Sequence, residues 1–263
     1  MRISTFISIL FFTGHYLLAQ SGGHEGNLPK YYKRHIHFGF HIGANTTDFR
    51  IHNVKGTDYG TDTLYYLNGG KNYSNPGNAD SILLMPLKTI YHQPEGGFNL
   101  GIVCDVRLHE YIRLRFLPTL SFGSRRLVYT YGQKEWGKAD TSFTRERHVE
   151  STFIMFPLIV KLQSKRFGNF GAYVIGGGSY SLDLASDKKV DPSNQIVRLK
   201  KNDYNVEAGG GVDFYLPYFK LGLEVKLISG MRDILYHDGS KFATPIKRLN
   251  SHVVFFTISF EGP

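Results

Sequence analysis

Three histidines alternate with apolar residues in the stretch HIHFGFH, at positions His35, His37 and His41. Successive side chains of an extended chain point to opposite faces, so these imidazoles share one face. Such spacing can present two imidazoles to a zinc ion, but no cysteine or fourth ligand stands at a matching spacing. The alternative is hydrogen bonding inside the fold, with Asp105 on a neighbouring strand as a partner. We favour hydrogen bonding and expect no metal and no cofactor.

A second group of reactive types is His148, Glu150 and Ser151, which are the side chains of a Ser/His/acid hydrolase. A triad is defined by geometry, and their spacing alone does not supply that geometry. A lipid-modifying enzyme is therefore the weakest hypothesis, and we expect no catalytic residues. The glycine runs 176–178 and 209–211 could suggest phosphate binding, but that mechanism needs a helix N-terminus and none follows them.

Apolar and polar residues alternate with a period of two in eight segments. This period is typical of strands with one face on an apolar phase and the other on a polar one. The segments are longer than the ~5–6 residues usual in soluble strands and suit the roughly 9–11 residues of a tilted strand across a bilayer. They cover residues 35–44, 98–108, 112–122, 149–163, 173–184, 204–216, 219–227 and 251–261.

The connections between these segments are alternately long and short. Short turns are expected at 109–111, 164–170 and 216–218, and long connections at 47–97, 123–148, 185–203 and 231–250. Outer-membrane barrels have short periplasmic turns and longer outer loops. The pattern predicts an all-β protein that forms an eight-stranded antiparallel transmembrane β-barrel over residues 35–263, with a long loop at 47–97.

Charged residues fall on the side of the strands opposite the apolar stripe. A soluble lipocalin-like barrel would reverse this arrangement, but the 17 Tyr and 20 Phe suit interfacial girdles of a membrane barrel. Eight strands enclose only enough space for side chains, so we expect a packed ionic network and no pore. The predicted lumen residues are Asp105, Arg107, Arg113, Arg115, Glu207, Asp213, Glu224 and Lys226.

Two prolines lie in the middle of predicted strands, at Pro118 and Pro157. Proline cannot donate to a ladder of backbone hydrogen bonds. Counted from the expected periplasmic ends of their strands, the two lie at nearly the same height. We therefore predict a bulge shared by the third and fourth strands.

The first residues read as an export signal: Arg2, an apolar run from Ile3 to Phe12, and the small residue Ala19 before a cleavage point. The run is too short and interrupted to favour a membrane anchor. We expect a cleaved signal at 1–19 and a periplasmic lead-in at 20–34. The single cysteine, Cys104, rules out an internal disulfide and is expected to act as a small hydrophobe.

The formal net charge of +9 comes from scattered pairs of basic residues between the predicted strands. An exported chain rarely meets nucleic acid, so we exclude that partner. Basic loops that face anionic lipid or polysaccharide explain the charge better. The expected partners are outer-membrane lipid and lipopolysaccharide, together with other proteins. The expected protein contacts at the periplasmic side are Lys30, Lys33, Arg34, Lys165 and Arg166.

Several strand segments resemble the PorT family of Bacteroidetes outer-membrane proteins. They include NLPKYYKRHIHFGFHIGANTTDFRI, GFNLGIVCDVRLHEYIRLRFLPTLSFG, ESTFIMFPLIVKLQSKRFGNFGAYVIGGGSYSLDLAS and VDFYLPYFKLGLEVKLISGMRDIL, and the likeness runs from about residue 27 to the end. The resemblance implies a non-enzymatic barrel needed for type IX protein secretion and, in gliding relatives, for motility. The main alternative is a structural or adhesive barrel without a secretion role.

Overall fold

The computed structural model describes residues 26–29, 31, 34–53, 61–66, 72–73, 81–133, 141–184, 199–237, 243 and 245–263. No helix among these residues is long and apolar enough to cross a membrane. The strands are β1 (Ile36–Asn53), β2 (Thr61–Tyr66), β3 (Asn72–Tyr73), β4 (Ser81–Arg107), β5 (Ile112–Phe116), β6 (Thr119–Gln133), β7 (Thr141–Gln163), β8 (Phe170–Asp183), β9 (Asn202–Tyr215), β10 (Lys220–Gly230) and β11 (Ile246–Glu261).

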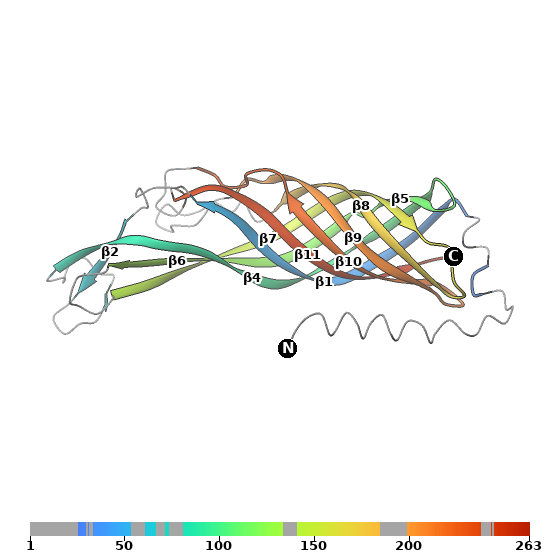
Figure 1. Cartoon of the computed structure of the whole chain (residues 1–263), viewed down its shortest axis with the longest axis horizontal. Coiled ribbons are helices and arrows are strands. Elements are labelled where there is room, and N and C mark those ends of the chain that lie inside the picture. The colour runs from blue at the N-terminus through green and yellow to red at the C-terminus, as the bar shows by residue number, and fades with distance from the viewer. Residues whose placement is uncertain are drawn as a thin grey trace.

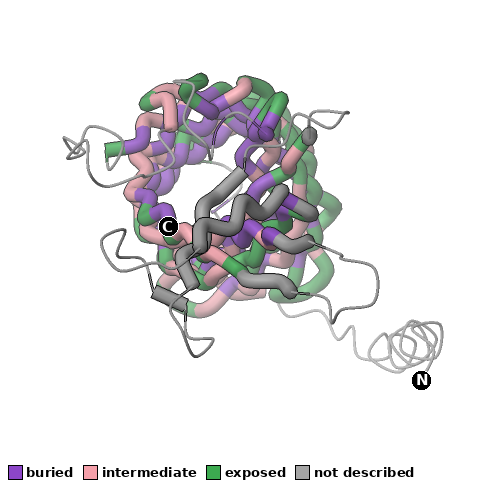
Figure 2. Tube along the Cα trace, turned by 90° about the vertical axis from the view of Figure 1, so that its left-hand side faces the viewer, coloured by how far each residue is buried: buried purple, intermediate pink, exposed green. Residues whose placement is uncertain are grey.

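The strands pair antiparallel with their neighbours and the sheet closes on itself. The first strand, β1, pairs with the last, β11, on one side and with β4 on the other, so that Ile42 lies opposite both Ile258 and Leu100. Because β5 and β6 share one place between β4 and β7, the wall has eight positions. Figure 1 shows the tilted strands from the side, and Figure 2 shows the ring that they form from one end. The prediction of an eight-stranded antiparallel barrel is confirmed.

The apolar stripe of each strand points outward. Phe38 is 65% exposed and Ile102 is 60% exposed, although both lie within paired strands of the wall. Leu223 also faces outward, and the outward ring of Phe214 packs edge-on against Phe170. Such a belt of exposed large apolar residues is stable only against an apolar solvent. The orientation inferred from the sequence, with lipid outside, is the one that the structure has.

The long connections are shorter than predicted because strands continue beyond their expected ends, and the first two are shortened most. The loop predicted at 47–97 contains the last residues of β1 and a long first part of β4, and the connection predicted at 123–148 contains most of β6 and the start of β7. These parts extend past the rest of the wall (Figure 1). Polar stretches such as 92–95 and 145–148 break the alternation there. Backbone pairing outside a membrane does not require that alternation, so the pattern gave no signal.

The proline pair interrupts one strand but produces no bulge. Pro118 lies in the gap between β5 and β6, whereas β7 continues through Pro157. The registers Phe116↔Leu158 and Thr119↔Met155 are the same on both sides of the gap, so no extra residue is inserted. The predicted shared bulge is therefore wrong, and the irregularity is confined to the third position of the wall.

The break has a simple cause in missing donors. Ile102 N donates to Pro118 O at 3.0 Å and Leu117 N donates to Pro157 O at 3.3 Å, but neither proline has an N–H to return the bond. Two successive residues thus each lose one ladder bond, on opposite sides of the strand. Thr119 Oγ1 donates to the carbonyl of Leu117 at 2.6 Å and satisfies the acceptor that Pro157 leaves open.

The end of the barrel that carries the long connections is closed by an apolar cluster. Side chains of β1, β4, β6 and β7 pack against residues of the segment between β10 and β11 and the start of β11. The cluster comprises Phe49, Leu87, Ile90, Leu127, Tyr129, Tyr131, Val149, Ile234, Leu235, Ala243, Ile246 and Leu249, all buried. The opposite end carries the short turns 108–111, 164–169 and 216–219 and the C-terminus (Figure 1).

Asp233 holds this closing segment in place. Its Oδ1 accepts hydrogen bonds from Leu249 N at 3.0 Å and Leu235 N at 3.2 Å, and its Oδ2 lies 3.0 Å from His237 Nε2. Burial alone would raise the pKa of the Asp233 carboxyl. Hydrogen bonds from Leu249, His237 and Leu235 outweigh burial and lower that pKa below its ordinary value.

We expect the docking of this segment to weaken in acid. Because the folded-state pKa of Asp233 is lowered, its stabilising effect is complete above the unfolded-state pKa of roughly 4 and is lost as the pH falls below it. Hydrogen exchange at the Leu249 amide checks this: protection should be high at pH 6 and lost first at low pH. In Asp233→Asn, the protection of the Leu249 amide should no longer differ between pH 6 and low pH. Equal pH sensitivity in the variant would contradict the role of the carboxylate.

Candidate functional site in the barrel lumen

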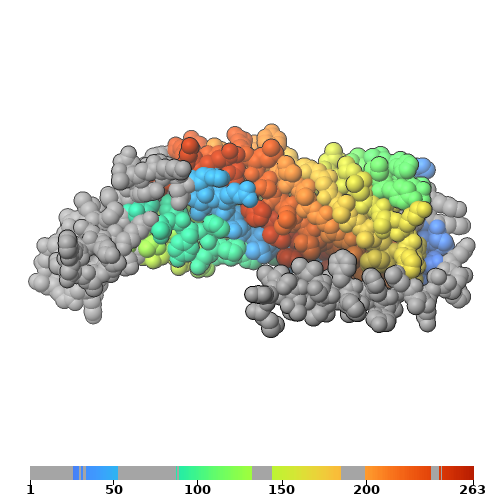
Figure 3. All heavy atoms as spheres, in the orientation of Figure 1, coloured from blue at the N-terminus to red at the C-terminus, as the bar shows by residue number. Residues whose placement is uncertain are grey.

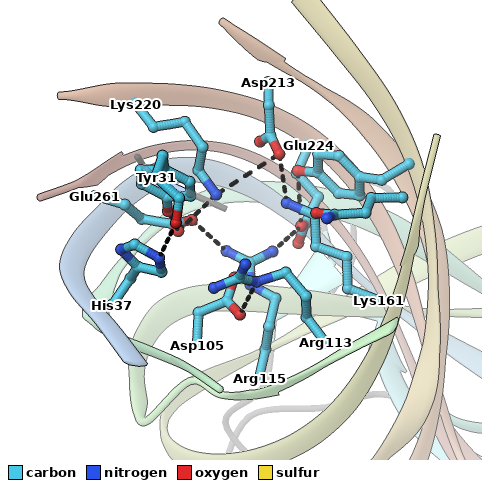
Figure 4. Close-up of polar contacts among 12 residues, drawn as sticks. Tyr31, His37, Asp105, Arg113, Arg115, Lys161, Asp213, Lys220, Glu224 and Glu261 are labelled. Carbon is cyan, nitrogen blue, oxygen red and sulfur yellow. Dashed lines mark hydrogen bonds and ion pairs between the residues drawn. The ribbon is translucent and has the colours of Figure 1, made fainter. Parts of the chain in front are cut away.

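The charged side chains of the lumen gather near the end with short turns. Period-two alternation directs them inward from six different strands, and each is almost completely buried (Figure 4). They are Asp105 on β4, Arg113 and Arg115 on β5, Lys161 on β7, Asp213 on β9, Lys220 and Glu224 on β10, and Glu261 on β11.

Arg115 lies at the centre of this lumen network. Its Nη1 lies 2.8 Å from Glu224 Oε2, and its Nη2 lies 3.2 Å from Glu261 Oε1. One guanidinium therefore links β5 to both β10 and β11 across the lumen. The planar fork of arginine is suited to contacts with two carboxylates in different directions.

The other members of the network also form ion pairs. Arg113 Nε lies 2.5 Å from Asp105 Oδ1 on the neighbouring strand. Lys161 Nζ lies 2.6 Å from Asp213 Oδ2, and its ammonium sits 3.7 Å from the centre of the Tyr173 ring. Lys220 Nζ lies 2.6 Å from Glu261 Oε2 and 3.6 Å from Asp213 Oδ2.

The network is balanced in charge. Four cations (Arg113, Arg115, Lys161 and Lys220) face four carboxylates (Asp105, Asp213, Glu224 and Glu261). Farther along the lumen, Lys226 Nζ and Glu207 Oε2 form another pair at 2.8 Å. Buried charges of one sign would cost several kcal/mol each, and pairing removes much of that cost. The arrangement cross-links strands and leaves no net charge on these ten groups.

Residues before β1 close the mouth of the barrel at the network. Tyr31 inserts its ring into the lumen, where it stacks on His37 with centroids 3.8 Å apart. Its hydroxyl donates to Glu261 Oε2 at 2.8 Å, and His37 Nε2 lies 3.0 Å from its carbonyl oxygen. The edge of the ring meets Tyr215. Tyr31 is therefore a plug that joins the lumen network (Figure 4).

Arg166, in the turn before β8, fastens the segment that carries this plug. Its guanidinium donates to the carbonyl groups of Asn27 and Leu28 and lies 4.2 Å above the Tyr215 ring. Asn27 Nδ2 in turn donates to Tyr215 O at 3.0 Å. A side chain that was predicted to contact another protein thus already contacts the chain's own lead-in.

The other predicted periplasmic residues lie in different settings. Arg34 is exposed and donates to Pro263 O at 2.6 Å, and Lys165 is exposed in the turn. Lys30 and Lys33 lie outside the described residues, as does the predicted signal at 1–19.

The structure places the predicted lumen residues as follows. Asp105, Arg113, Arg115, Glu207, Asp213, Glu224 and Lys226 are buried inside, whereas Arg107 is half-buried at the mouth. Lys161, Lys220, Glu261 and Tyr31 belong to the network but were not on the list. Lys161, Lys220 and Glu261 stand at positions whose side chains point inward in the alternation of their strands, so the alternation could have identified them. Tyr31 precedes the first strand and carried no periodic signal.

The histidines take part in hydrogen bonds, but not with the predicted partner. His37 lies opposite Asp105 in the register, yet the Asp105 carboxylate binds Arg113. His41 Nε2 lies 3.2 Å from Thr119 Oγ1, and His35 is exposed. In the part of the chain that the structure describes, no cluster of three or more His, Cys, Asp or Glu side chains could hold a metal.

The lumen is less polar than the sequence suggested. Five apolar or aromatic side chains form a buried cluster inside it. They are Val103, Leu117, Ile159, Tyr173 and Ile175. Ile159 lies within the predicted segment 149–163, and Tyr173 stands at the first residue of the predicted fifth strand.

His148, Glu150 and Ser151 do not form a triad. His148 and Glu150 are exposed on the outer face, whereas Ser151 is buried and points to the opposite face. Alternation along β7 separates them, because residues 148 and 150 point to one face of the strand and residue 151 points to the other. No proton relay among these three is possible in this arrangement.

Comparison with known families agrees with this architecture. The family model described as outer membrane protein beta-barrel domain matches residues 18–236. The chain therefore belongs to the outer membrane protein beta-barrel domain family, and its place is the outer membrane. No curated protein matches the chain.

Three solved structures are similar at low identity. The outer membrane protein OprG from Pseudomonas aeruginosa is 12% identical, with a TM-score of 0.38 over 86% of this chain and 97% of that one. Ail, the attachment invasion locus protein of Yersinia pestis, solved with the heparin analogue sucrose octasulfate, is 10% identical, with a TM-score of 0.33 over 87% and 99%. The outer membrane protease OmpT from Escherichia coli is 15% identical, with a TM-score of 0.34 over 87% and 96%. At these scores we draw no functional conclusion from them.

Proposed function

We propose that this chain is a non-enzymatic outer-membrane barrel that assists type IX protein secretion through contacts with other proteins, and gliding motility in organisms that glide. The resemblance to the PorT family supplies the secretion role. The observation that carries the mode of action is that described side chains pack both ends of the lumen, which favours action through the surfaces of the barrel over conduction.

Side chains of the described residues occupy both ends of the lumen. The Tyr31 plug and the balanced ion pairs occupy the end with short turns, and the cluster around Phe49 and Tyr129 occupies the other end. The cavity beside His41, Arg115 and Glu224 measures about 10 Å³, which is room for one water. Conduction of a folded or unfolded protein through this space would require the network to be dismantled.

The surfaces open to partners lie at the two ends, beyond the lipid-facing belt. Lys165 and Arg34 are exposed at the end with short turns, and Lys30 and Lys33 belong to the same predicted periplasmic contact. Arg166 contributes indirectly by holding the lead-in. We propose that partners of the secretion machinery bind at this end.

A deletion strain tests the proposal. Loss of type IX cargo from the medium, restored by the wild-type gene, is the expected result. Complementation with Lys165→Glu should restore less cargo than complementation with the matched change Lys247→Glu at the opposite end, while both proteins accumulate normally in the membrane. Normal cargo export in the deletion strain would remove the secretion role.

The same strain separates the alternatives. Altered surface binding with intact export would indicate a structural or adhesive barrel. A lipid-modifying enzyme would require Ser151, so complementation with Ser151→Ala should leave lipid A and phospholipid profiles unchanged if the barrel is not an enzyme.

A further inference from the structure

Basic side chains cluster on the outer face of the barrel where β1 lies beside β11. Arg50 and His52 on β1 and Arg248 on β11 are all exposed, as is Lys247 beside Arg248. Arg232 is also exposed and follows Met231, whose carbonyl accepts a hydrogen bond from Arg248. In Figure 3 the blue residues of β1 and the red residues of β11 adjoin on the visible face, near the end with long connections. We call Arg50, His52 and Arg248 the outer basic patch.

The register brings the three side chains together. His52 is the direct partner of Arg248, and Arg50 is paired with Asn250, so Arg50 is a diagonal neighbour of Arg248. Directly opposed residues have Cβ atoms about 4.5–5.5 Å apart and diagonal neighbours about 7–8 Å. Two guanidinium groups and an imidazole therefore share one small area.

The two arginines of the outer basic patch have no carboxylate partner in the part of the chain that the structure describes. Asp48, two residues before Arg50 on the same strand, already binds His92 Nδ1 at 2.5 Å and Phe49 N at 2.7 Å. Arg248 donates one hydrogen bond to Met231 O, which leaves other N–H groups of its guanidinium for a ligand.

The patch lies at the height of lipid headgroups. An apolar belt about 25 Å tall takes roughly ten residues of a tilted strand, which on β1 runs from Ile36 to about Thr46. Arg50 is then roughly 10 Å beyond the edge of the belt, a distance that its long side chain can reduce by bending toward the membrane.

An apolar surface for acyl chains lies farther along the same strands, toward the end with short turns. A shallow hollow in the outer wall crosses the strands that carry the patch and their neighbours. Its apolar lining includes Ile42, Ala44, Leu223, Val225, Phe256 and Ile258. The patch and the hollow together match the two parts of an anionic lipid: basic side chains for its headgroup and an apolar surface for its acyl chains.

We propose that the outer basic patch binds the phosphate groups of a lipopolysaccharide-type glycolipid whose acyl chains lie on this part of the wall. Arginine forks bind phosphate oxygens in pairs, and each Arg or Lys near an anionic surface contributes about 1 kcal/mol. The site is independent of the secretion role and requires only that the long connections face the outer leaflet.

The test measures lipid binding to the folded full-length barrel in detergent by native mass spectrometry. The probes are bisphosphorylated lipid A and the same lipid after enzymatic removal of its phosphates. The variant is Arg50→Gln/Arg248→Gln, and the matched control is Arg34→Gln/Lys165→Gln, which removes two exposed cations from the opposite end. Migration in unheated gels verifies that each variant is folded.

We expect the patch variant to bind bisphosphorylated lipid A roughly ten- to thirtyfold more weakly than the wild type, and the control to bind as the wild type does. The dephosphorylated lipid should bind the wild type as weakly as the phosphorylated lipid binds the patch variant. Equal loss in the control variant, equal binding of the dephosphorylated lipid, or displacement of the lipid by millimolar inorganic phosphate would each overturn the proposal.

Discussion

Replacement of Glu261 by alanine should lower the free energy of unfolding of the barrel by about 3–5 kcal/mol. Removal of one member of a buried ion pair leaves its partner charged and without compensation, which is the costly case. Glu261 has partners on three sides: Lys220 at 2.6 Å, Arg115 at 3.2 Å and the hydroxyl of Tyr31 at 2.8 Å. The substitution therefore leaves the buried network with one more cation than carboxylates and also loosens the plug.

Urea unfolding in lipid vesicles measures this loss. Glu110→Ala is the matched control, because Glu110 lies exposed in the turn between β4 and β5. The control should stay within about 0.5 kcal/mol of the wild type. If Glu261→Ala changed the free energy of unfolding as little as the control does, the network would not be a structural cross-link.

Introduction of arginine at Leu223 should cost about 2–4 kcal/mol in a bilayer. Leu223 is 39% exposed on the outer face of β10, between the lipid-facing residues Leu221 and Val225. A cation on the lipid face of a barrel near the bilayer midplane is destabilising by this amount, and the cost falls toward the interfaces.

Introduction of arginine at an exposed position outside the belt serves as the control. Tyr236 is 49% exposed in the segment after β10, so Tyr236→Arg should change stability by no more than about 0.5 kcal/mol. A small effect of Leu223→Arg would mean that this face is not in contact with lipid.

The wall of the barrel was predictable because lipid and lumen impose one alternation on every strand. Phe38, Ile102 and Leu223 face outward, and Asp105 and Glu224 face inward, as parity requires. The extensions of β4, β6 and β7 were not predictable in this way. Outside the belt both faces of a strand contact protein or water, so the sequence there is free of the constraint that made the other segments visible.

The partners within the lumen could not be read from the sequence. Arg115 and Glu261 are 146 residues apart in the chain, and their contact depends on which strands close the ring. The position of Tyr31 depends on Arg166 and Asn27, which lie far apart in the sequence and outside any periodic segment. Likewise, the two prolines predicted an irregularity, but only the register shows that no residue is inserted.

The single cysteine offers the most direct test of the outward apolar face. Cys104 lies on β4 between Phe38 of β1 and Phe116 of β5, on the side that faces away from the lumen. A fluorophore attached to Cys104 in reconstituted vesicles should be quenched by lipids that carry a nitroxide on their acyl chains and hardly at all by aqueous iodide. Strong quenching by iodide without quenching by the labelled lipids would contradict the account of a barrel with lipid outside and charge within.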